Sequence, residues 1–426
     1  MKVLWISNIP VGALSQRLTG KRTNGLWLEA LLSEFKKSSE HNVVFATAYK
    51  VKKTVKVIDD NVTYYALPDN YPPLYNANKK KNLAAWKEVI DSEKPDIIHV
   101  FGTEFPHGLC ALKVKGDIPA VIHMQGVMSS IARFYLAGIP YKEIKKTITF
   151  RDIIKKDGIL SQQKKFYRAA KHGREMISIA KNVITENDWC DSYVKAAYPE
   201  VKIYKRAESL NEIFKSAKWD IDKAEKHSIM CTASGYTIKG LHIMLRALAM
   251  LKASYPDVKL YVPGTPQVSG KSLKSKIKRS GYTKYIEKLI KELNVKDNVV
   301  WTGEIKQSEL LNYYLKVRAF VLCSAIENHS NSLKEAMTVG VPSVASAVGG
   351  VTYYAKDGEN ALLYRFEEYE VLADKLNKLF TDDSLCEKLS VSGREKMISM
   401  HDGKEIFSKT VEIYNDIINS YKQQVN

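Results

Sequence analysis

Short apolar runs alternate with stretches of helical periodicity along most of the chain. Each apolar run ends in a polar or glycine-containing turn, and the stretch that follows repeats apolar residues every three or four positions. Runs typical of buried strands lie at 2–7, 42–47, 62–67, 95–100, 121–126, 183–190, 228–232, 260–264, 299–305 and 319–322. Helices are expected at 26–35, 79–90, 241–251, 308–315, 367–379, 382–399 and 403–421. Strands that alternate with helices predict the α/β class with doubly wound parallel sheets.

The chain divides into two predicted domains. A length of 426 residues is large for a single core. Residues 201–227 show little periodicity and many charges, so we place the connection between the domains there. The sequence therefore predicts one Rossmann-like domain at 1–205, a second at 206–402, and a terminal helix at 403–426.

The stretch from 319 to 350 carries the clearest candidate chemistry. An apolar run leads into a polar turn and then into a helix that Gly340 ends. Ligands of parallel sheets bind beyond the carboxyl ends of the strands, where this turn lies. The free N–H groups and the dipole at the helix start, around Ser330, Asn331 and Ser332, favour a phosphate.

Two glutamates bracket the start of that helix. Glu327 lies in the turn and Glu335 in the helix, so both can face one crevice. Because carboxylates repel phosphate, their natural partner is a hydroxyl-rich group such as a sugar. The alternative is structural: Ser332 and Glu335 have the Ser-x-x-Glu spacing of a capping box, which only closes a helix end.

A second candidate phosphate site follows the strand at 228–232. The run from Ala233 to Gly240 contains several small residues and ends in Lys239-Gly240 at a predicted helix start. Helix amides attract a diphosphate, and an ammonium group neutralises it. A lysine at a helix start is otherwise most often a surface residue, but its position in this strand exit favours a functional role.

The residues from 327 to 350 resemble the E-x7-E block of glycosyltransferase family 4. Glu327 is followed by seven residues and then by Glu335-Ala336-Met337, Gly340-Val341-Pro342 and Val348-Gly349-Gly350. The resemblance implies the GT-B fold, in which two Rossmann-like domains face a cleft, and a retaining hexosyltransferase that uses a nucleotide-sugar donor. It also implies that Glu327 lies near the donor sugar and phosphates and that Glu335 binds the ribose hydroxyls. Asn328-His329-Ser330 replaces the family's Gly-Phe-Gly after the first glutamate.

The resemblance extends to further donor-binding positions. Lys239-Gly240 matches part of the family pattern Gly-Arg followed by Lys-Gly, while Tyr236 replaces the arginine after Gly235. The resemblance implies that the phosphates are bound by Ser330, Asn331, Ser332 and Leu333. It implies that Glu304 and Ile305 contact the base, and that Gly25 approaches a donor phosphate or sugar. Glu327 and Lys239 are expected to be catalytic, the lysine because it would stabilise the charge of the leaving group. The expected donor is a UDP- or GDP-sugar.

Two strand ends in the first domain carry the predicted acceptor side. They resemble family segments that carry histidines where this chain has Phe101 and Gln125. In this chain His99 and His123 lie two residues earlier on the same strands, so their side chains point the same way as those of Phe101 and Gln125. We interpret His99 as a core histidine, whereas His123 is either a core residue or a third catalytic residue. Gln125 and Glu104 are the candidate acceptor-binding residues.

The segment 128–181 differs in composition from the rest of the chain. Between 142 and 181 it holds twelve Lys or Arg residues and four acids, with apolar residues interleaved. The pattern predicts two basic amphipathic helices divided near Gly158. Such helices either lie on an anionic membrane surface or form a solvated basic face over a core. Their place in the predicted acceptor domain favours a sugar or lipid-linked acceptor in cell-surface polysaccharide or glycolipid synthesis.

Composition narrows the remaining choices. Hydrophobic residues make up 45% of the chain and charged residues 26%, as in folded proteins. No apolar run approaches the roughly 18 residues that span a bilayer, and the first residues are typical of a strand rather than a signal peptide. We therefore expect a protein that is cytoplasmic or peripheral on the inner face of the membrane. Five scattered cysteines fit free thiols, and no D-x-D-like motif stands at a strand exit, so no metal or other obligatory cofactor is expected.

A net charge of +18 leaves other functions open. A nucleotide-sugar epimerase of GT-B-like architecture would share the donor site but need no acceptor. A glycogen-phosphorylase-like enzyme would need a lysine-bound pyridoxal phosphate. A basic nucleic-acid-binding protein would explain the charge but not the two phosphate-type strand exits, and no nucleic-acid-binding motif is present, so nucleic acid is not an expected partner.

Overall fold

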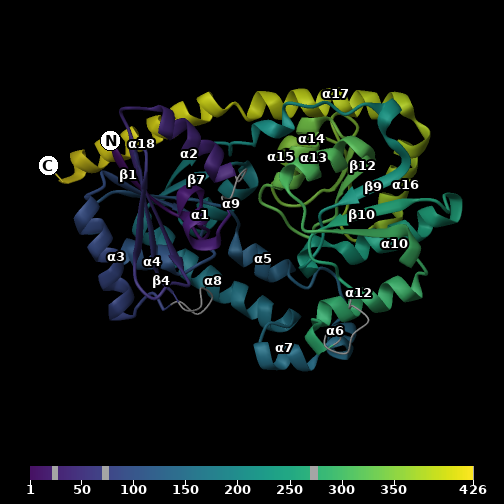
Figure 1. Cartoon of the computed structure of the whole chain (residues 1–426), viewed down its shortest axis with the longest axis horizontal. Coiled ribbons are helices and arrows are strands. Elements are labelled where there is room, and N and C mark those ends of the chain that lie inside the picture. Colours follow the sequence, from purple (N-terminus) through teal and green to yellow (C-terminus); the bar gives the residue numbers. More distant parts are fainter. Residues whose placement is uncertain (22–26, 70–75, 269–276, 426) are drawn as a thin grey trace. The chain divides into compact units, whose positions relative to one another are not determined.

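The computed structural model describes residues 1–21, 27–69, 76–268 and 277–425 (Figure 1). These residues form two compact units. Unit 1 contains Met1–Ser129, Phe166–Asn211 and His401–Asn426, and unit 2 contains Ser130–Lys165 and Glu212–Met400. This division differs from the predicted one mainly in the segment 130–165, which packs within unit 2 rather than with the first domain.

Unit 1 is built on an eight-stranded sheet in the order β3-β4-β2-β1-β5-β6-β7-β8. Its strands are β1 (Lys2–Ile6), β2 (Asn42–Tyr49), β3 (Val55–Asp59), β4 (Val62–Pro68), β5 (Ile97–Phe101), β6 (Ala120–His123), β7 (Asn182–Thr185) and β8 (Lys202–Lys205). All neighbours pair in parallel except β3, which is antiparallel to β4. The predicted doubly wound parallel sheet is confirmed.

Helices cover both faces of the unit 1 sheet. They are α1 (Gly12–Thr19), α2 (Trp27–Lys37), α3 (Lys80–Glu93), α4 (His107–Lys113), α9 (Asp188–Ala197), α18 (Gly403–Val425), the first residues of α5 (Met128–Phe134) and most of α8 (Ile159–Ala180). Successive residues of β1 point to opposite faces, so Trp5 packs in a cluster with Phe35 and Tyr414, while Ile6 packs in a second cluster with Trp86. The helix α18 is fixed by the bond from Trp5 Nε1 to Tyr414 Oη at 3.0 Å.

Two strands at the edges of this sheet were not predicted. Along β3 half-buried and exposed residues alternate, and β8 has no buried residue. Edge strands contact the core on few positions, so they lack the apolar run that marks the central strands. Because β8 occupies 202–205, the predicted connection 201–227 begins too early. The strand expected at 183–190 is also shorter than predicted: it ends at Thr185, and Asn187 caps α9.

Unit 2 is built on a six-stranded sheet in the order β11-β10-β9-β12-β13-β14. Its strands are β9 (Glu225–Cys231), β10 (Lys259–Pro263), β11 (Val299–Gly303), β12 (Val317–Leu322), β13 (Ser343–Ser346) and β14 (Leu362–Tyr364), and all pair in parallel. Strands β10 and β11 lie on one side of β9, and the next strand in sequence, β12, lies on the other side. Strand order therefore reverses between β9 and β12, which is where doubly wound sheets bind ligands.

Besides the last residues of α5 and the first of α8, helices separate and flank the strands of unit 2. The set is α6 (Tyr141–Thr147), α7 (Phe150–Lys155), α10 (Leu241–Ser254), α12 (Gly281–Glu292), α13 (Gln307–Lys316), α14 (Asn331–Val339), α15 (Val351–Tyr354), α16 (Tyr369–Thr381) and α17 (Asp383–Met400). Short 3-10 turns precede β9 and α10. In the described ranges, no helix is long and apolar enough to cross a membrane.

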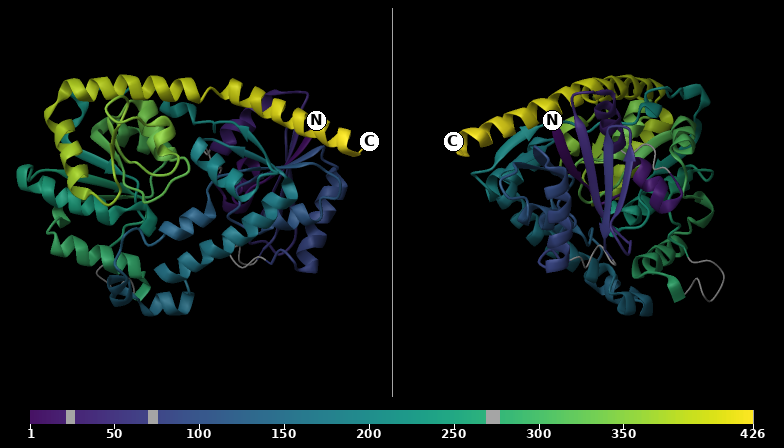
Figure 2. Two further views of the ribbon diagram at one scale, coloured as in Figure 1. Left: turned by 180° about the vertical axis from the view of Figure 1, so that it is seen from behind. Right: turned by 60° about the vertical axis from the view of Figure 1, so that its left-hand side comes forward.

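In the basic segment the short helix α6 packs against α12 (Figures 1 and 2), whereas most of the longer α8 belongs to unit 1. Glu143 accepts a bond from Lys288 on α12 at 2.5 Å. The expected break near Gly158 is found, since α7 ends at Lys155 and α8 begins at Ile159. The first of the two predicted helices is itself divided, because Thr149 caps α7 and ends the run that begins with α6.

The carboxylate of Asp152 holds this segment in place, and its loss should loosen it. Asp152 is buried and accepts from Gly281 N at 2.8 Å and from Thr149 N at 3.2 Å. We expect Asp152→Ala to cost about 1–3 kcal/mol locally, because the buried Gly281 N–H loses its partner. Hydrogen exchange of 141–157 and 281–285 should accelerate. Asp152→Asn, whose amide oxygen still accepts a bond, is the control; equal protection in wild type and Asp152→Ala would contradict this role.

Candidate functional site

The two predicted phosphate-binding exits follow neighbouring strands of unit 2. Strands β9 and β12 are paired, with Val321 opposite Cys231, so their carboxyl ends lie side by side. The exit of β9 leads through the 3-10 turn Thr237–Lys239 into α10, and the exit of β12 leads through 323–330 into α14. Two helix starts therefore meet at one edge of the sheet.

An ion pair joins the two exits. The Lys239 ammonium lies 2.6 Å from Glu327 Oε1, and Ser324 Oγ donates to the same oxygen at 2.6 Å. The Glu327 side chain is 11% exposed and that of Lys239 35%, so a ligand can reach the lysine more readily than the acid. The structure thus brings together both residues that we expected to be catalytic in this domain.

Backbone contacts fix the distance between the exits. Gly240 has φ +73°, and a Cβ there would lie 1.6 Å from the carbonyl oxygen of Cys323, so this position requires glycine. Ala325 N donates to Ile238 O at 2.7 Å, which ties the loops a second time. The Cys323 thiol donates to Lys239 O at 3.2 Å. All five cysteines are buried and free, as expected.

The start of α14 is capped by Ser330, not by Ser332. Ser330 Oγ accepts from Leu333 N at 3.4 Å, whereas Ser332 lies inside the helix and accepts from Thr232 Oγ1 at 2.8 Å. The capping-box alternative for Ser332 and Glu335 is therefore wrong. The hydroxyls of Ser330 and Ser332 lie 3.3 Å apart at the helix start, where Asn331 is the first helical residue.

Glu335 occupies a different environment from Glu327. Tyr314 Oη, on α13, donates to Glu335 Oε2 at 3.4 Å. Burial raises the pKa of the Glu335 carboxyl to about 7, although the positive charge of Lys334 and the bond from Tyr314 act in the opposite direction. A carboxyl that binds a proton near neutral pH can accept bonds from hydroxyl groups and can exchange that proton on binding.

The other predicted donor-binding residues lie at the same edge of the sheet, with one exception. Gly235 has φ +103° and open space around its Cα. Glu304 and Ile305 directly follow β11, and Glu304 is exposed. Gly25 lies outside the described residues.

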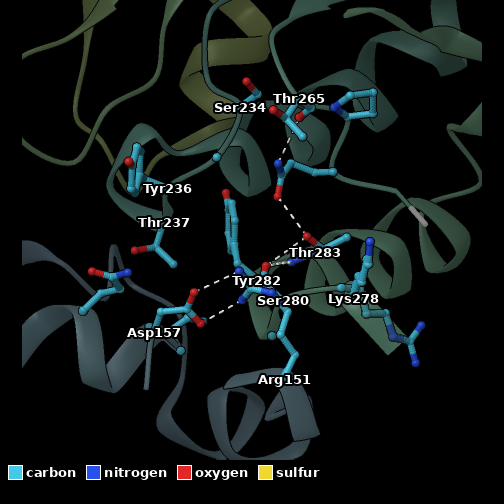
Figure 3. A pocket seen from close by; sticks show the side chains of 18 of the residues that line it. Arg151, Asp157, Ser234, Tyr236, Thr237, Thr265, Lys278, Ser280, Tyr282 and Thr283 are labelled. Carbon is cyan, nitrogen blue, oxygen red and sulfur yellow. Dashed lines mark hydrogen bonds and ion pairs between the residues drawn. The ribbon is translucent and has the colours of Figure 1, made fainter. Parts of the chain in front are cut away.

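A cavity of about 660 Å³ opens beside Gly235 (Figure 3). Its walls come from the exits of β9 and β10, the start of α12, and the helices that follow Tyr135. The lining includes Tyr135, Arg151, Asp157, Gln162, Tyr236, Gln267, Lys278 and Tyr282. Arg151 is held by Asp157 through two bonds of 2.8 and 2.9 Å. Tyrosine rings with amide and hydroxyl groups suit a ligand that carries many hydroxyls.

His123 lies in unit 1 among other ionisable residues. Arg206 Nη2 donates to His123 Nδ1 at 2.8 Å, so the neutral ring carries its proton on Nε2, which lies 3.6 Å from Glu186 Oε1. Within the described ranges, His123, Glu186 and Glu208 are the one group of possible metal ligands close enough to share an ion, and the Arg206 guanidinium opposes a cation there. The imidazole has no exposed surface, so the catalytic role of His123 stays a prediction.

The two candidate acceptor-binding residues lie together in unit 1. A Cβ on Gly102, whose φ is +85°, would meet Glu104 Oε2 at 1.9 Å and Gln125 Cγ at 3.3 Å. Burial and the nearby Glu208 raise the pKa of Glu104 to about 7, against backbone hydrogen bonds that lower it. His99, by contrast, is a core histidine as expected, fully buried and 2.5 Å from Tyr414 Oη.

Sequence reasoning missed three residues that support the site. Ser324 contacts Glu327, Tyr314 contacts Glu335, and Thr232 contacts Ser332. Ser324 and Thr232 are small polar residues directly after apolar strands, which is a usable signal. Tyr314 lies on a helix that carries no local sign of function, so only the fold reveals its contact.

The family of the chain follows from this geometry together with a match to known sequences. Residues 212–396 match the family "Glycosyl transferases group 1". This range contains the ion pair, both helix starts and both glutamates. Residues 212–396 therefore form a domain of the group 1 glycosyltransferases, which are family 4.

Relatives of this glycosyltransferase cover most of its length. The uncharacterized glycosyltransferase YqgM of Bacillus subtilis is 26% identical over 62% of this chain and 70% of that protein. N-acetyl-alpha-D-glucosaminyl L-malate synthase of Bacillus anthracis is 24% identical over 83% of this chain and 82% of its own.

Solved structures confirm the GT-B fold of this glycosyltransferase. The match to sucrose-phosphate synthase from Thermosynechococcus elongatus covers 98% of this chain and 99% of the synthase chain, with a TM-score of 0.72 and 17% identity. HepE from Anabaena, solved with UDP-glucose, matches 98% of this chain and 100% of its own with a TM-score of 0.66 and 14% identity. At these identities the likeness shows the fold.

The raised pKa of Glu335 predicts a pH-dependent stability of unit 2. Between pH 4.5 and about 7 the folded protein keeps a proton that the unfolded chain has lost, so the free energy of unfolding falls as pH rises. The loss amounts to at most about 3 kcal/mol. Glu335→Gln should therefore raise the melting temperature at pH 8 relative to wild type and leave it nearly unchanged at pH 4.5, measured by scanning calorimetry.

An exposed glutamate on α17 supplies the control for this measurement. Glu395→Gln should shift the melting temperature equally at both pH values. A Glu335→Gln effect that is the same at pH 4.5 and pH 8 would show that the carboxyl titrates in its ordinary range.

Proposed function

We propose that this enzyme binds the diphosphate of a UDP- or GDP-sugar at the paired exits of β9 and β12, and transfers the sugar with retention to an acceptor hydroxyl. The ion pair between Lys239 and Glu327 carries the proposal, because it sets an ammonium group and a carboxylate within one crevice. The starts of α10 and α14 add amide groups and helix dipoles for the phosphates. HepE, which shares the fold, was solved with UDP-glucose.

Each residue of the crevice has a proposed task. Lys239 exchanges part of its contact with Glu327 for the diphosphate and stabilises the charge that develops on it as the sugar leaves. The backbone amides from Ser330 to Leu333 also stabilise this negative charge on the diphosphate. Glu327, held by Ser324, orients the donor sugar through its hydroxyls. No obligatory metal is required in this scheme, since the cation is supplied by the protein.

The other proposed contacts follow the positions of the remaining predicted residues. Glu335 binds the ribose hydroxyls, and Glu304 and Ile305 contact the base at the exit of β11. Gly235 borders a cavity with room for a sugar. Glu104 and Gln125, which meet around Gly102 in unit 1, are proposed to contact the acceptor in cell-surface polysaccharide or glycolipid synthesis.

Removal of the Lys239 charge should impair transfer more than it impairs folding. We expect Lys239→Met to lower kcat/KM for the donor by about 10²–10³-fold, the effect of losing one group that stabilises the leaving charge. Hydrolysis of UDP-glucose or GDP-mannose without added acceptor supplies the assay. The matched control is Lys375→Met on α16, which removes a lysine that lies 3.0 Å from an Asp357 carboxylate oxygen. This variant should keep full activity. Equal rates for both variants would refute the assignment.

The proton on Glu335 should link donor affinity to pH. Ribose hydroxyls donate to the ionised carboxylate, so binding lowers its pKa and releases a proton wherever the free enzyme still holds one. The affinity for UDP-glucose, whose diphosphate does not titrate near neutral pH, should rise between pH 6 and pH 8. Titration calorimetry of Glu335→Gln should show weaker binding without this rise. A wild-type affinity that is flat over this range would exclude the ribose contact.

A further inference from the structure

Helices α6 and α7 and the turn between them present a row of exposed apolar side chains. Phe150 is 71% exposed, Ile153 65% and Ile154 62%, and Ile148 and Tyr141 are also exposed. We call this set, together with the lysines around it, the α6–α7 surface. Single exposed apolar residues are ordinary on a protein, but five on a segment of this length form a patch, which marks an interaction site.

Lysines surround these apolar side chains. Lys142, Lys145, Lys146, Lys155 and Lys156 are all exposed. The acids of the same segment are engaged by the protein. Glu143 binds Lys288 at 2.5 Å and Lys146 at 3.3 Å, Asp152 accepts from Gly281 N, and Asp157 binds Arg151. The charge that the α6–α7 surface turns to solvent is therefore positive.

A small apolar cavity of about 220 Å³ adjoins this surface. Ile144, Ile148, Ile153, Ile159 and Leu160 contribute to its lining. It shares Gly158, Ile159 and Gly281 with the larger polar cavity beside Gly235. An apolar cavity next to the exposed apolar side chains gives this surface a place for part of an acyl chain.

We propose that the α6–α7 surface docks this enzyme on an anionic phospholipid bilayer. Phe150, Ile153 and Ile154 enter the boundary between headgroups and acyl chains, and the lysines meet the lipid phosphates. Both terms are needed, because the apolar area of one short helix is small and the electrostatic attraction alone is weakened by salt. The α6–α7 surface contains no predicted donor-binding residue, so docking and donor binding can be tested separately.

Vesicle sedimentation tests the apolar part of this surface. The full chain is mixed with vesicles of equal parts phosphatidylglycerol and phosphatidylcholine, or of phosphatidylcholine alone. We expect binding to the anionic vesicles that falls steeply with salt, and a loss of at least tenfold in the partition coefficient for Phe150→Ser/Ile153→Ser/Ile154→Ser. A matched triple variant, Ile58→Ser/Met250→Ser/Val391→Ser, removes exposed apolar residues elsewhere and should bind as wild type.

Replacement of the five lysines by glutamine tests the electrostatic part. This variant should lose its preference for anionic over neutral vesicles. No binding by wild type, equal binding to both kinds of vesicle, or equal losses in the two apolar triple variants would overturn the proposal. A dimer of the wild-type protein in sedimentation velocity, disrupted only by the Phe150→Ser/Ile153→Ser/Ile154→Ser variant, would also overturn the proposal. The surface would then bind a second copy of the chain.

A site-specific probe reports insertion without depending on a loss of binding. The native cysteines are buried, so Ile154→Cys can be labelled selectively with an environment-sensitive fluorophore. Anionic vesicles should shift its emission to the blue, whereas a label at Val391→Cys should not respond. An unchanged spectrum at position 154 while the protein sediments with vesicles would place the contact elsewhere.

Discussion

The parallel pairing of β9 with β12 is the constraint on which the candidate site depends. The chain adds two strands on one side of β9 and then crosses to the other side, so two exits distant in sequence become neighbours. Each exit starts a helix, and each supplies one partner of the ion pair between Lys239 and Glu327. The close approach of Gly240 to the Cys323 carbonyl leaves no space for a side chain and holds the two exits at this distance.

The same exits give two glutamates different properties. Glu327 lies against an ammonium group and a hydroxyl, while Glu335 lies one turn inside α14 beside Tyr314, where burial raises its pKa to about 7. One acid can thus balance the charge of Lys239 while the other receives hydroxyl groups. Two carboxylates of the same type thus acquire different charge states from their surroundings.

The central parts of the fold and site could be predicted because their signals are local. Apolar runs mark the central strands, and small polar residues mark their exits, so Lys239, Ser330 and Glu335 could be placed after the ends of strands; their binding roles stay predictions. The edge strands β3 and β8 have few buried positions and gave no such signal. Contacts between distant elements, such as Tyr314 with Glu335 and Asp152 with Gly281, depend on packing that no local pattern encodes. For the same reason the sequence did not predict that residues 130–165 pack within unit 2.

A crystal structure of the enzyme with bound UDP-glucose tests the central claim most directly. We predict that the diphosphate lies between the starts of α10 and α14, with an oxygen within hydrogen-bonding distance of Lys239 Nζ and another near the amides after Ser330. A nucleotide sugar bound at another edge of the molecule, with the ion pair between Lys239 and Glu327 untouched, would contradict it.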